Sequence, residues 1–149
     1  MDAYKIYIKS RKHYLKGNLF FAKLYLKMNR IINNSYIPYT AEIGKESIFG
    51  YGGIGVVLHP DCKIGKNCTI GQNCTIGGRT GHGGPPIIGD NVYIGPGARL
   101  LGSFRIGNNV IIGANAVVIS EVPNNCIVAG VPAKIIRTDV SKFQNENII

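Results

Sequence analysis

The chain has 149 residues, which is enough for one domain with a core of its own. Its 17 Lys and Arg residues against 8 Asp and Glu residues give a formal net charge of +9, which suggests an anionic ligand or surface, although a solvated basic surface would also account for it. Apolar runs stay short of the ~18 residues that span a bilayer, and Lys and Arg break up the apolar residues near the N-terminus. These features argue against a membrane span and a signal peptide, so we expect a cytoplasmic protein.

Residues 2–33 carry apolar and basic side chains at helical spacing. Gly17 and Asn18 predict a break between two helices. One predicted apolar face consists of Phe21, Leu24, Tyr25, Met28 and Ile32. We expect this face to cap the open end of the domain that follows. A basic amphipathic segment of this kind also suits a peripheral contact with an anionic membrane, and this alternative stays open.

An aliphatic residue returns every six positions between residues 58 and 123. The series is Leu58, Ile64, Ile70, Ile76, Ile88, Ile94, Leu100, Ile106, Ile112 and Val118. A helix repeats its apolar face every 3.6 residues and a strand every 2, so a period of six indicates a larger recurring unit. One short strand and one tight turn fill six residues. The pattern therefore predicts an all-β solenoid in which three six-residue faces close each coil.

The residues between the aliphatic positions fit the corners of such a coil. Gly and Asn are common at the positions after each aliphatic residue, which we expect because the backbone at a corner needs a positive φ. Cys62, Cys68 and Cys74 recur with the same spacing of six, at the small corner position, and Cys126 is the fourth cysteine. No C-x-x-C pair or histidine cluster accompanies them, so we expect reduced structural thiols and no metal site.

The repeat disappears between Ile76 and Ile88, where a glycine-rich loop that contains His82 leaves the coil. Loops on rigid scaffolds often carry the chemistry of a protein. The predicted organisation is a helical segment over residues 1–35, a β-helix domain over 36–137 and a polar C-terminal tail over 138–149.

Three features together resemble the left-handed β-helix acyltransferases, and most closely the branch that contains serine acetyltransferases and the sugar O-acetyltransferases of surface polysaccharide synthesis. They are the Ile-Gly units, the histidine-bearing loop followed by Ile-Gly-Asp-Asn-Val-Tyr-Ile-Gly-Pro-Gly-Ala at 88–98, and Ala-Gly-Val-Pro-Ala-Lys at 129–134. The resemblance covers residues 36–137. It implies left-handed coils, against the usual handedness of parallel crossovers. It also implies a homotrimer, acetyl-CoA as co-substrate and active sites between subunits.

Acetyl transfer to a hydroxyl needs a base for the alcohol proton and a group that stabilises the oxyanion. Histidine suits the first role because it changes charge near neutral pH. His82 matches the catalytic loop of the superfamily and is our predicted base. His59 either orients the substrate or is an ordinary corner residue before Pro60, and His13 is expected on the surface of the helical segment. A route through an acyl-cysteine is disfavoured because the corner position buries the thiols.

The resemblance also implies a donor site in a groove between subunits. On the matching positions, Gly95, Gly113 and Ala114 would contact the pantetheine arm, and Lys134 and Arg137 the phosphates of coenzyme A. The alternative is that the two basic residues are ordinary solvated charges.

Two departures from the serine acetyltransferase pattern argue against serine as the acceptor. The helical segment is short, and Tyr51 and Gly52 stand where those enzymes carry a second histidine. The predicted function is therefore an acetyl-CoA-dependent O-acetyltransferase that acts on a sugar hydroxyl in surface polysaccharide synthesis, with no nucleic-acid partner. The alternatives are a serine O-acetyltransferase of cysteine biosynthesis and a non-catalytic β-solenoid scaffold.

Overall fold

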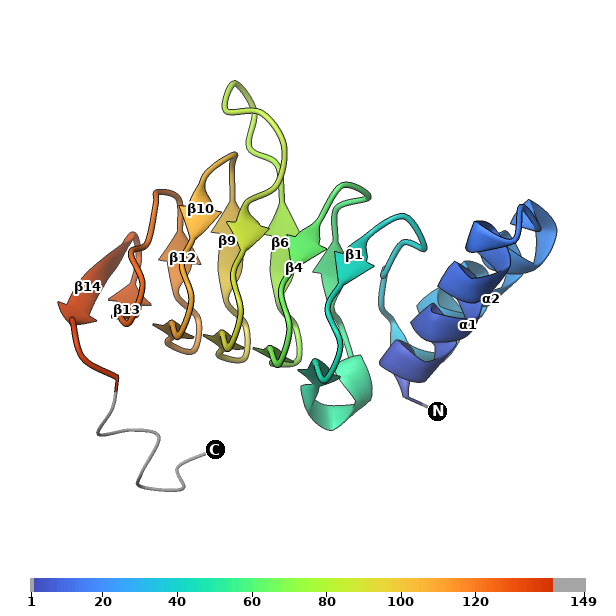
Figure 1. Cartoon of the computed structure of the whole chain (residues 1–149), viewed down its shortest axis with the longest axis horizontal. Coiled ribbons are helices and arrows are strands. Elements are labelled where there is room, and N and C mark those ends of the chain that lie inside the picture. The colour runs from blue at the N-terminus through green and yellow to red at the C-terminus, as the bar shows by residue number, and fades with distance from the viewer. Residues whose placement is uncertain (1, 141–149) are drawn as a thin grey trace.

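A computed structural model describes residues 2–140 of the chain (Figure 1). Two helices, α1 (Ala3–Leu15) and α2 (Leu19–Asn33), lie at one end of a stack of short strands. They are separated at Gly17 and Asn18, as the sequence predicted. No helix in residues 2–140 has the length and apolar character that a membrane span requires. The predicted tail lies outside the described residues from position 141 onward.

The strands form three parallel sheets of a left-handed β-helix, which confirms the predicted fold. The first sheet contains β1 (Glu42–Ile43), β4 (Lys63–Ile64), β7 (Ile87–Ile88) and β10 (Arg105–Ile106). The second sheet contains β2 (Ile48–Phe49), β5 (Thr69–Ile70), β8 (Tyr93–Ile94), β11 (Ile111–Ile112), β13 (Ile127–Gly130) and β14 (Ala133–Arg137). The third sheet contains β3 (Val57–Leu58), β6 (Thr75–Gly77), β9 (Arg99–Leu101) and β12 (Val117–Val118). Among the strands of residues 2–140, only β14 runs antiparallel to its neighbour, which is β13.

Three corners join these sheets, and we name them by their place in the coil. The first corner, residues 65–68 and their equivalents, links the first sheet to the second. The second corner, 71–74 and equivalents, links the second sheet to the third and includes the 3₁₀ turn η1 (Gly50–Gly53). The third corner, 59–62 and equivalents, leads from the third sheet to the next coil.

The residues of the six-residue series fill the centre of the prism. All ten are buried, with none more than 5% exposed, and in each two-residue strand the second residue points inward. Full burial of a branched aliphatic side chain contributes about 1.5–3 kcal/mol, so the column is the main source of stability. The small residues four places later, such as Cys68 and Ala98, are also buried.

The positive φ of the first corner does not come from the glycine that follows the aliphatic residue, as the sequence suggested. At the first corner the left-handed residue is Asn67, with φ of 52°, and not the glycine that follows Ile64. Gly65 has another reason to be glycine, because a Cβ there would lie 2.4 Å from the carbonyl oxygen of Gly89 in the next coil. At the first corner asparagine thus supplies the positive φ and glycine permits the close approach of successive coils, whereas at the second corner Gly55 and Gly97 have positive φ as predicted, with φ of 70° and 74°.

Helix α1 covers the N-terminal end of the solenoid. Ala3 and Tyr7 belong to the same buried cluster as the aliphatic column. The Tyr7 hydroxyl donates a hydrogen bond of 2.7 Å to the carbonyl oxygen of Ala41, and the Tyr4 ring stacks on Phe49 at 5.5 Å. Burial raises the pKa of Tyr7 to about 12. The first helix therefore performs the predicted capping.

Helix α2 packs only in part through its predicted apolar face, since Phe21 and Tyr25 stack on His13 of α1 but the face does not reach the solenoid core. Phe21, Leu24 and Ile32 of that face are 42%, 42% and 48% exposed. The buried residues of α2 are instead Ala22, Asn29 and Asn33. The prediction that this face caps the solenoid is therefore wrong for α2.

Polar contacts explain the orientation of α2. The Ser10 hydroxyl donates to the carbonyl oxygen of Ala22 at 2.7 Å, a close approach that the small side chain of Ala22 allows. Asn29 Nδ2 donates to the carbonyl oxygen of Ala3 at 3.0 Å. Asn33 Nδ2 donates to Asn29 Oδ1 at 2.9 Å. Because these buried amides are hydrogen-bonded, burying them costs little.

Candidate active site

The loop that carries His82 leaves the third corner between β6 and β7 and extends beyond the coils (Figure 1). The backbone N–H of His82 donates to the carbonyl oxygen of Arg79 at 2.8 Å, and its carbonyl oxygen accepts from the N–H of Ser103 in the following coil at 3.0 Å. Gly81 and Gly83, on either side, have φ of 77° and 75°. The backbone of His82 is thus anchored while its side chain is exposed to solvent.

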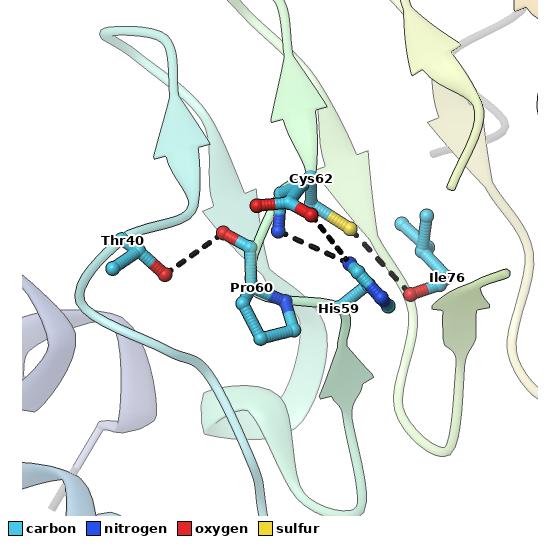
Figure 2. Close-up of polar contacts among 6 residues, drawn as sticks. Thr40, His59, Pro60, Cys62 and Ile76 are labelled. Atoms are coloured by element: carbon cyan, nitrogen blue, oxygen red, sulfur yellow. Dashed lines mark hydrogen bonds and ion pairs between the residues drawn. The ribbon is translucent and has the colours of Figure 1, made fainter. Parts of the chain in front are cut away.

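His59 lies at the same corner one coil earlier. Leu58 pairs in register with Ile76, and the N–H of His59 donates to the carbonyl oxygen of Ile76 at 2.8 Å. Figure 2 shows its ring turned toward the turn that follows Pro60. There Nδ1 accepts a hydrogen bond of 3.1 Å from the N–H of Asp61.

That hydrogen bond determines which ring nitrogen of neutral His59 carries the proton. An accepting Nδ1 has no hydrogen, so Nε2 carries it and acts as a donor. The Asp61 carboxylate lies 3.6 Å from the same nitrogen, Nδ1. The local geometry therefore suits His59 to donating a hydrogen bond more than to abstracting a proton.

The structure places the two histidines on one edge of the prism but does not join them. Within residues 2–140, His82 bonds through its backbone to Arg79 and Ser103, whereas His59 bonds to Asp61, Cys62 and Ile76, and no hydrogen bond links the two. The third histidine, His13, lies in the helical hairpin. It is half-buried between the rings of Phe21 and Tyr25, at 5.1 and 5.6 Å, so its expected surface position is wrong.

Arg79 is a candidate site residue that the spacing of the repeat did not point to. It lies in the same loop as His82 and is half-buried. Its Nε is buried without a hydrogen-bond partner among the described residues. A buried donor without a partner is costly, and a guanidinium matches the geometry of a carboxylate. Periodicity could not have identified Arg79, because the repeat is interrupted at this loop.

The residues expected at the donor site form a row along the second corner and the last strands. Two backbone hydrogen bonds connect this row: the N–H of Gly95 donates to Ile112 O, and the N–H of Gly113 donates to Val128 O. Beyond them, Ala129 pairs with Lys134. Gly95, Gly113 and Lys134 therefore follow one another across the coils. Gly95 is buried, because the backbone of Ala114 occupies the place of a Cβ. Ala114 and Lys134 are exposed, as is Arg137, which pairs with Ile127 farther along β14.

The cysteines are buried free thiols. Figure 2 shows Cys62 directed toward Ile76, whose carbonyl oxygen lies 3.5 Å from Sγ. Desolvation raises the pKa of Cys62 to about 12, and burial also raises the pKa of Cys68 and Cys74. A neutral, covered thiol is a poor nucleophile, which argues against an acyl-cysteine route. Among residues 2–140 there is also no group of three or more His, Cys, Asp or Glu side chains that could hold a metal ion.

Comparison with known proteins agrees with this architecture. The family model described as "Bacterial transferase hexapeptide (six repeats)" matches residues 53–78 and 85–120. Over these residues the chain has the repeats of the hexapeptide-repeat superfamily of left-handed β-helix acyltransferases. The interruption between the two matched segments contains the loop of His82.

Among curated members of this superfamily, serine acetyltransferase of Staphylococcus xylosus is 40% identical over 128 residues, which cover 85% of this chain and 59% of the relative. Serine acetyltransferase of Staphylococcus aureus (strain Mu50) is 39% identical over 139 residues, covering 92% and 62%. This hexapeptide-repeat chain therefore spans about three fifths of the length of those relatives.

Solved structures of the same superfamily also match. Serine acetyltransferase of Neisseria gonorrhoeae in complex with serine superimposes with a TM-score of 0.83 at 32% identity, covering 91% of this chain and 55% of that one. Serine acetyltransferase of Brucella abortus in complex with coenzyme A gives a TM-score of 0.84 at 29% identity, covering 92% and 55%.

These matches correct the predicted acceptor. The relatives are named serine acetyltransferases, so the prediction of a sugar hydroxyl in polysaccharide synthesis is wrong, and the alternative of a serine acetyltransferase is the better one. The prediction relied on the short helical segment and on Tyr51. Tyr51 lies in η1 at the second corner, whereas His59 and the loop of His82 lie at the third corner of the same chain.

Proposed function

We propose that this chain transfers an acetyl group from acetyl-CoA to the hydroxyl of L-serine in the cytoplasm. One observation carries the proposal: a chain similar to serine acetyltransferases over about nine tenths of its length presents an exposed histidine on a loop anchored to the coils. The four free, buried cysteines are consistent with a reducing compartment.

In this reaction the serine oxygen attacks the thioester carbonyl carbon while His82 accepts the hydroxyl proton. The tetrahedral oxyanion needs hydrogen-bond donors, and the Nε2–H of His59 is suited to this role. When the intermediate collapses, the carbon–sulfur bond breaks and the proton passes from His82 to the leaving thiolate. O-acetylserine and coenzyme A result, and no metal takes part in these steps.

Arg79 would bind the carboxylate of serine. Arg79 is half-buried in the loop of His82 and carries a planar guanidinium whose N–H groups match the two oxygens of a carboxylate. This contact would favour an amino acid over a neutral alcohol, because a neutral alcohol would leave the guanidinium without an anionic partner. Arg79 is therefore the residue that we expect to select the acceptor.

Acetyl-CoA would lie along the row that passes Gly113, Ala114 and Lys134, with Lys134 and Arg137 near its phosphates. This row follows the second corner, whereas the loop of His82 starts at the third corner. Within one prism the third sheet lies between these two corners. A site that uses both would combine the second corner of one protomer with the third corner of another. This arrangement supports a homotrimer.

The deciding experiment follows release of coenzyme A by a thiol reagent, with acetyl-CoA as donor and L-serine, D-serine, ethanolamine and hydroxylated sugars as acceptors. We expect turnover with L-serine and a large loss with ethanolamine, which lacks the carboxylate. Turnover with a sugar but not with serine would refute the acceptor. Loss of turnover with every acceptor, in a protein that still binds coenzyme A, would instead favour a non-catalytic solenoid.

A further inference from the structure

The outward face of α2 is apolar where a surface helix is normally polar. Ala22, Asn29 and Asn33 face inward, and at 100° per residue the opposite side of the helix carries Phe20, Leu24 and Ile31. The exposed fractions of these three side chains are 73%, 42% and 73%. Helix α2 thus buries amides and exposes aromatic and aliphatic groups, which leaves its apolar face without a partner within residues 2–140.

Basic residues flank this apolar stripe. Lys23, Lys27 and Arg30 lie along one side of it, and all three are exposed. They also border a surface hollow of about 340 Å³, whose lining is completed by Leu26, Ile31 and Tyr36. No acidic side chain lines the hollow, so it offers positive charge above an apolar floor.

The net charge of the chain is concentrated in the same hairpin. Residues 2–33 hold eight Lys and Arg residues and one acidic residue, Asp2, so they carry a formal +7 of the total of +9. The turn between the helices extends the apolar surface, because Leu15 and Leu19 are 69% and 48% exposed. A second copy of the chain would bring another +7 against this surface, which disfavours self-association.

We propose that the outer face of α2, defined by Phe20, Lys23, Leu24, Lys27, Arg30 and Ile31, binds the surface of an anionic phospholipid bilayer. The apolar side chains would enter the boundary between headgroups and acyl chains, and the basic side chains would remain at the level of the phosphates. Lys and Arg side chains near an anionic surface strengthen binding, so the three basic residues of the face add to the apolar contribution. The solenoid would then project away from the membrane.

The test is co-sedimentation of the full chain with vesicles of phosphatidylcholine, with and without phosphatidylglycerol. The variant Lys23→Glu/Lys27→Glu changes the charge of the face, and Phe20→Ser/Ile31→Ser removes its apolar side chains. Lys63→Glu/Lys66→Glu is the matched control, since it makes the same change of charge on exposed side chains of the solenoid. All of these positions are exposed, and circular dichroism would verify that each variant is folded.

We expect the wild type to bind vesicles that contain phosphatidylglycerol and to remain largely unbound with phosphatidylcholine alone. Both face variants should weaken binding at least roughly tenfold, and the control by much less. Three outcomes would overturn the proposal: no binding by the wild type, equal binding to neutral vesicles, or equal loss in the control. In the absence of lipid, a lower molecular mass for Phe20→Ser/Ile31→Ser than for the wild type would show that the face binds a second copy of the chain. That outcome would also overturn the proposal.

Discussion

Asn91 Nδ2 donates a hydrogen bond of 3.0 Å to Asn109 Oδ1, which lies one coil farther along the first corner. Both residues have a left-handed backbone, with φ of 56° and 55°. The ladder extends to Asn67 before them, at 2.9 Å, and to Asn125 after them, at 2.9 Å. One residue type thus meets the conformational requirement of the corner and links successive coils.

Replacement of Asn109 should therefore destabilise the fold more than an ordinary surface substitution. Asn109→Ala removes two side-chain hydrogen bonds and leaves a residue with a Cβ at positive φ, at an expected cost of about 1–3 kcal/mol. Asn109→Gly relieves the backbone but also lacks the amide, so it should cost less. Unfolding in denaturant measures both. Lys45→Ala, at an exposed position, is the control, and an equal effect there would contradict the role of the ladder.

Gly65 and Gly84 form a matched pair for the close approach of coils. A Cβ at Gly65 would lie 2.4 Å from a backbone oxygen, whereas a Cβ at Gly84 would meet nothing within 4 Å. We expect Gly65→Ala to cost about 1–3 kcal/mol or more, as overpacking does, and Gly84→Ala to be neutral within about 0.5 kcal/mol. Thermal unfolding of the two variants would decide. Equal melting temperatures would show that the coils can separate at little cost.

His82→Ala should lower kcat about 10²–10⁴-fold, the usual contribution of a general base, and leave the affinity for acetyl-CoA nearly unchanged. His59→Ala should lower kcat less, because it removes a hydrogen-bond donor and not the base. His13→Ala, in the hairpin, is the control and should keep kcat. Steady-state kinetics would measure all three. Full turnover in His82→Ala with loss in His59→Ala would reverse the two roles.

Arg79→Lys tests the selection of the acceptor. The lysine keeps the positive charge but loses the planar fork, so the KM for L-serine should rise roughly tenfold while the KM for acetyl-CoA stays constant. Arg79→Met, which also removes the charge, should raise the KM for serine further. A parallel change in both KM values would mean that Arg79 supports the loop as a whole and does not contact the carboxylate.

The raised pKa of Cys62 predicts a loss of stability in alkali. Below its ordinary pKa of 9.0 the thiol is neutral in the folded and unfolded chain alike, so it contributes no pH dependence there. Between pH 9.0 and about 12 the unfolded chain releases a proton that the folded chain retains, which favours unfolding by about 1.4 kcal/mol per pH unit for this thiol. Denaturant unfolding at several pH values above 9.0 would measure the slope. The slope should be smaller in Cys62→Ala, and an unchanged slope would exclude this thiol as the cause.

Much of the scaffold was predictable because local spacing determines it. The six-residue return from Leu58 to Val118 corresponds to the stacked column, since each coil repeats the same backbone geometry and each side chain contacts its equivalents. Gly17 and Asn18 likewise divide the two helices, as local turn chemistry requires. The resemblance to the hexapeptide-repeat acyltransferases was also recognised from this repeat.

The tertiary structure decided what periodicity cannot encode. The predicted apolar face of α2 had the pattern of a core surface, but the buried side of the helix is the one with Ala22 and the hydrogen-bonded Asn29 and Asn33, and Leu24 and Ile32 remain exposed. Likewise, only the fold shows that His59 accepts from Asp61 at Nδ1 and that Arg79 lacks a partner at Nε. A repeat specifies contacts between equivalent positions. Contacts between non-equivalent side chains depend on three-dimensional packing, and such contacts decide both the surroundings of His59 and the side of α2 that faces inward.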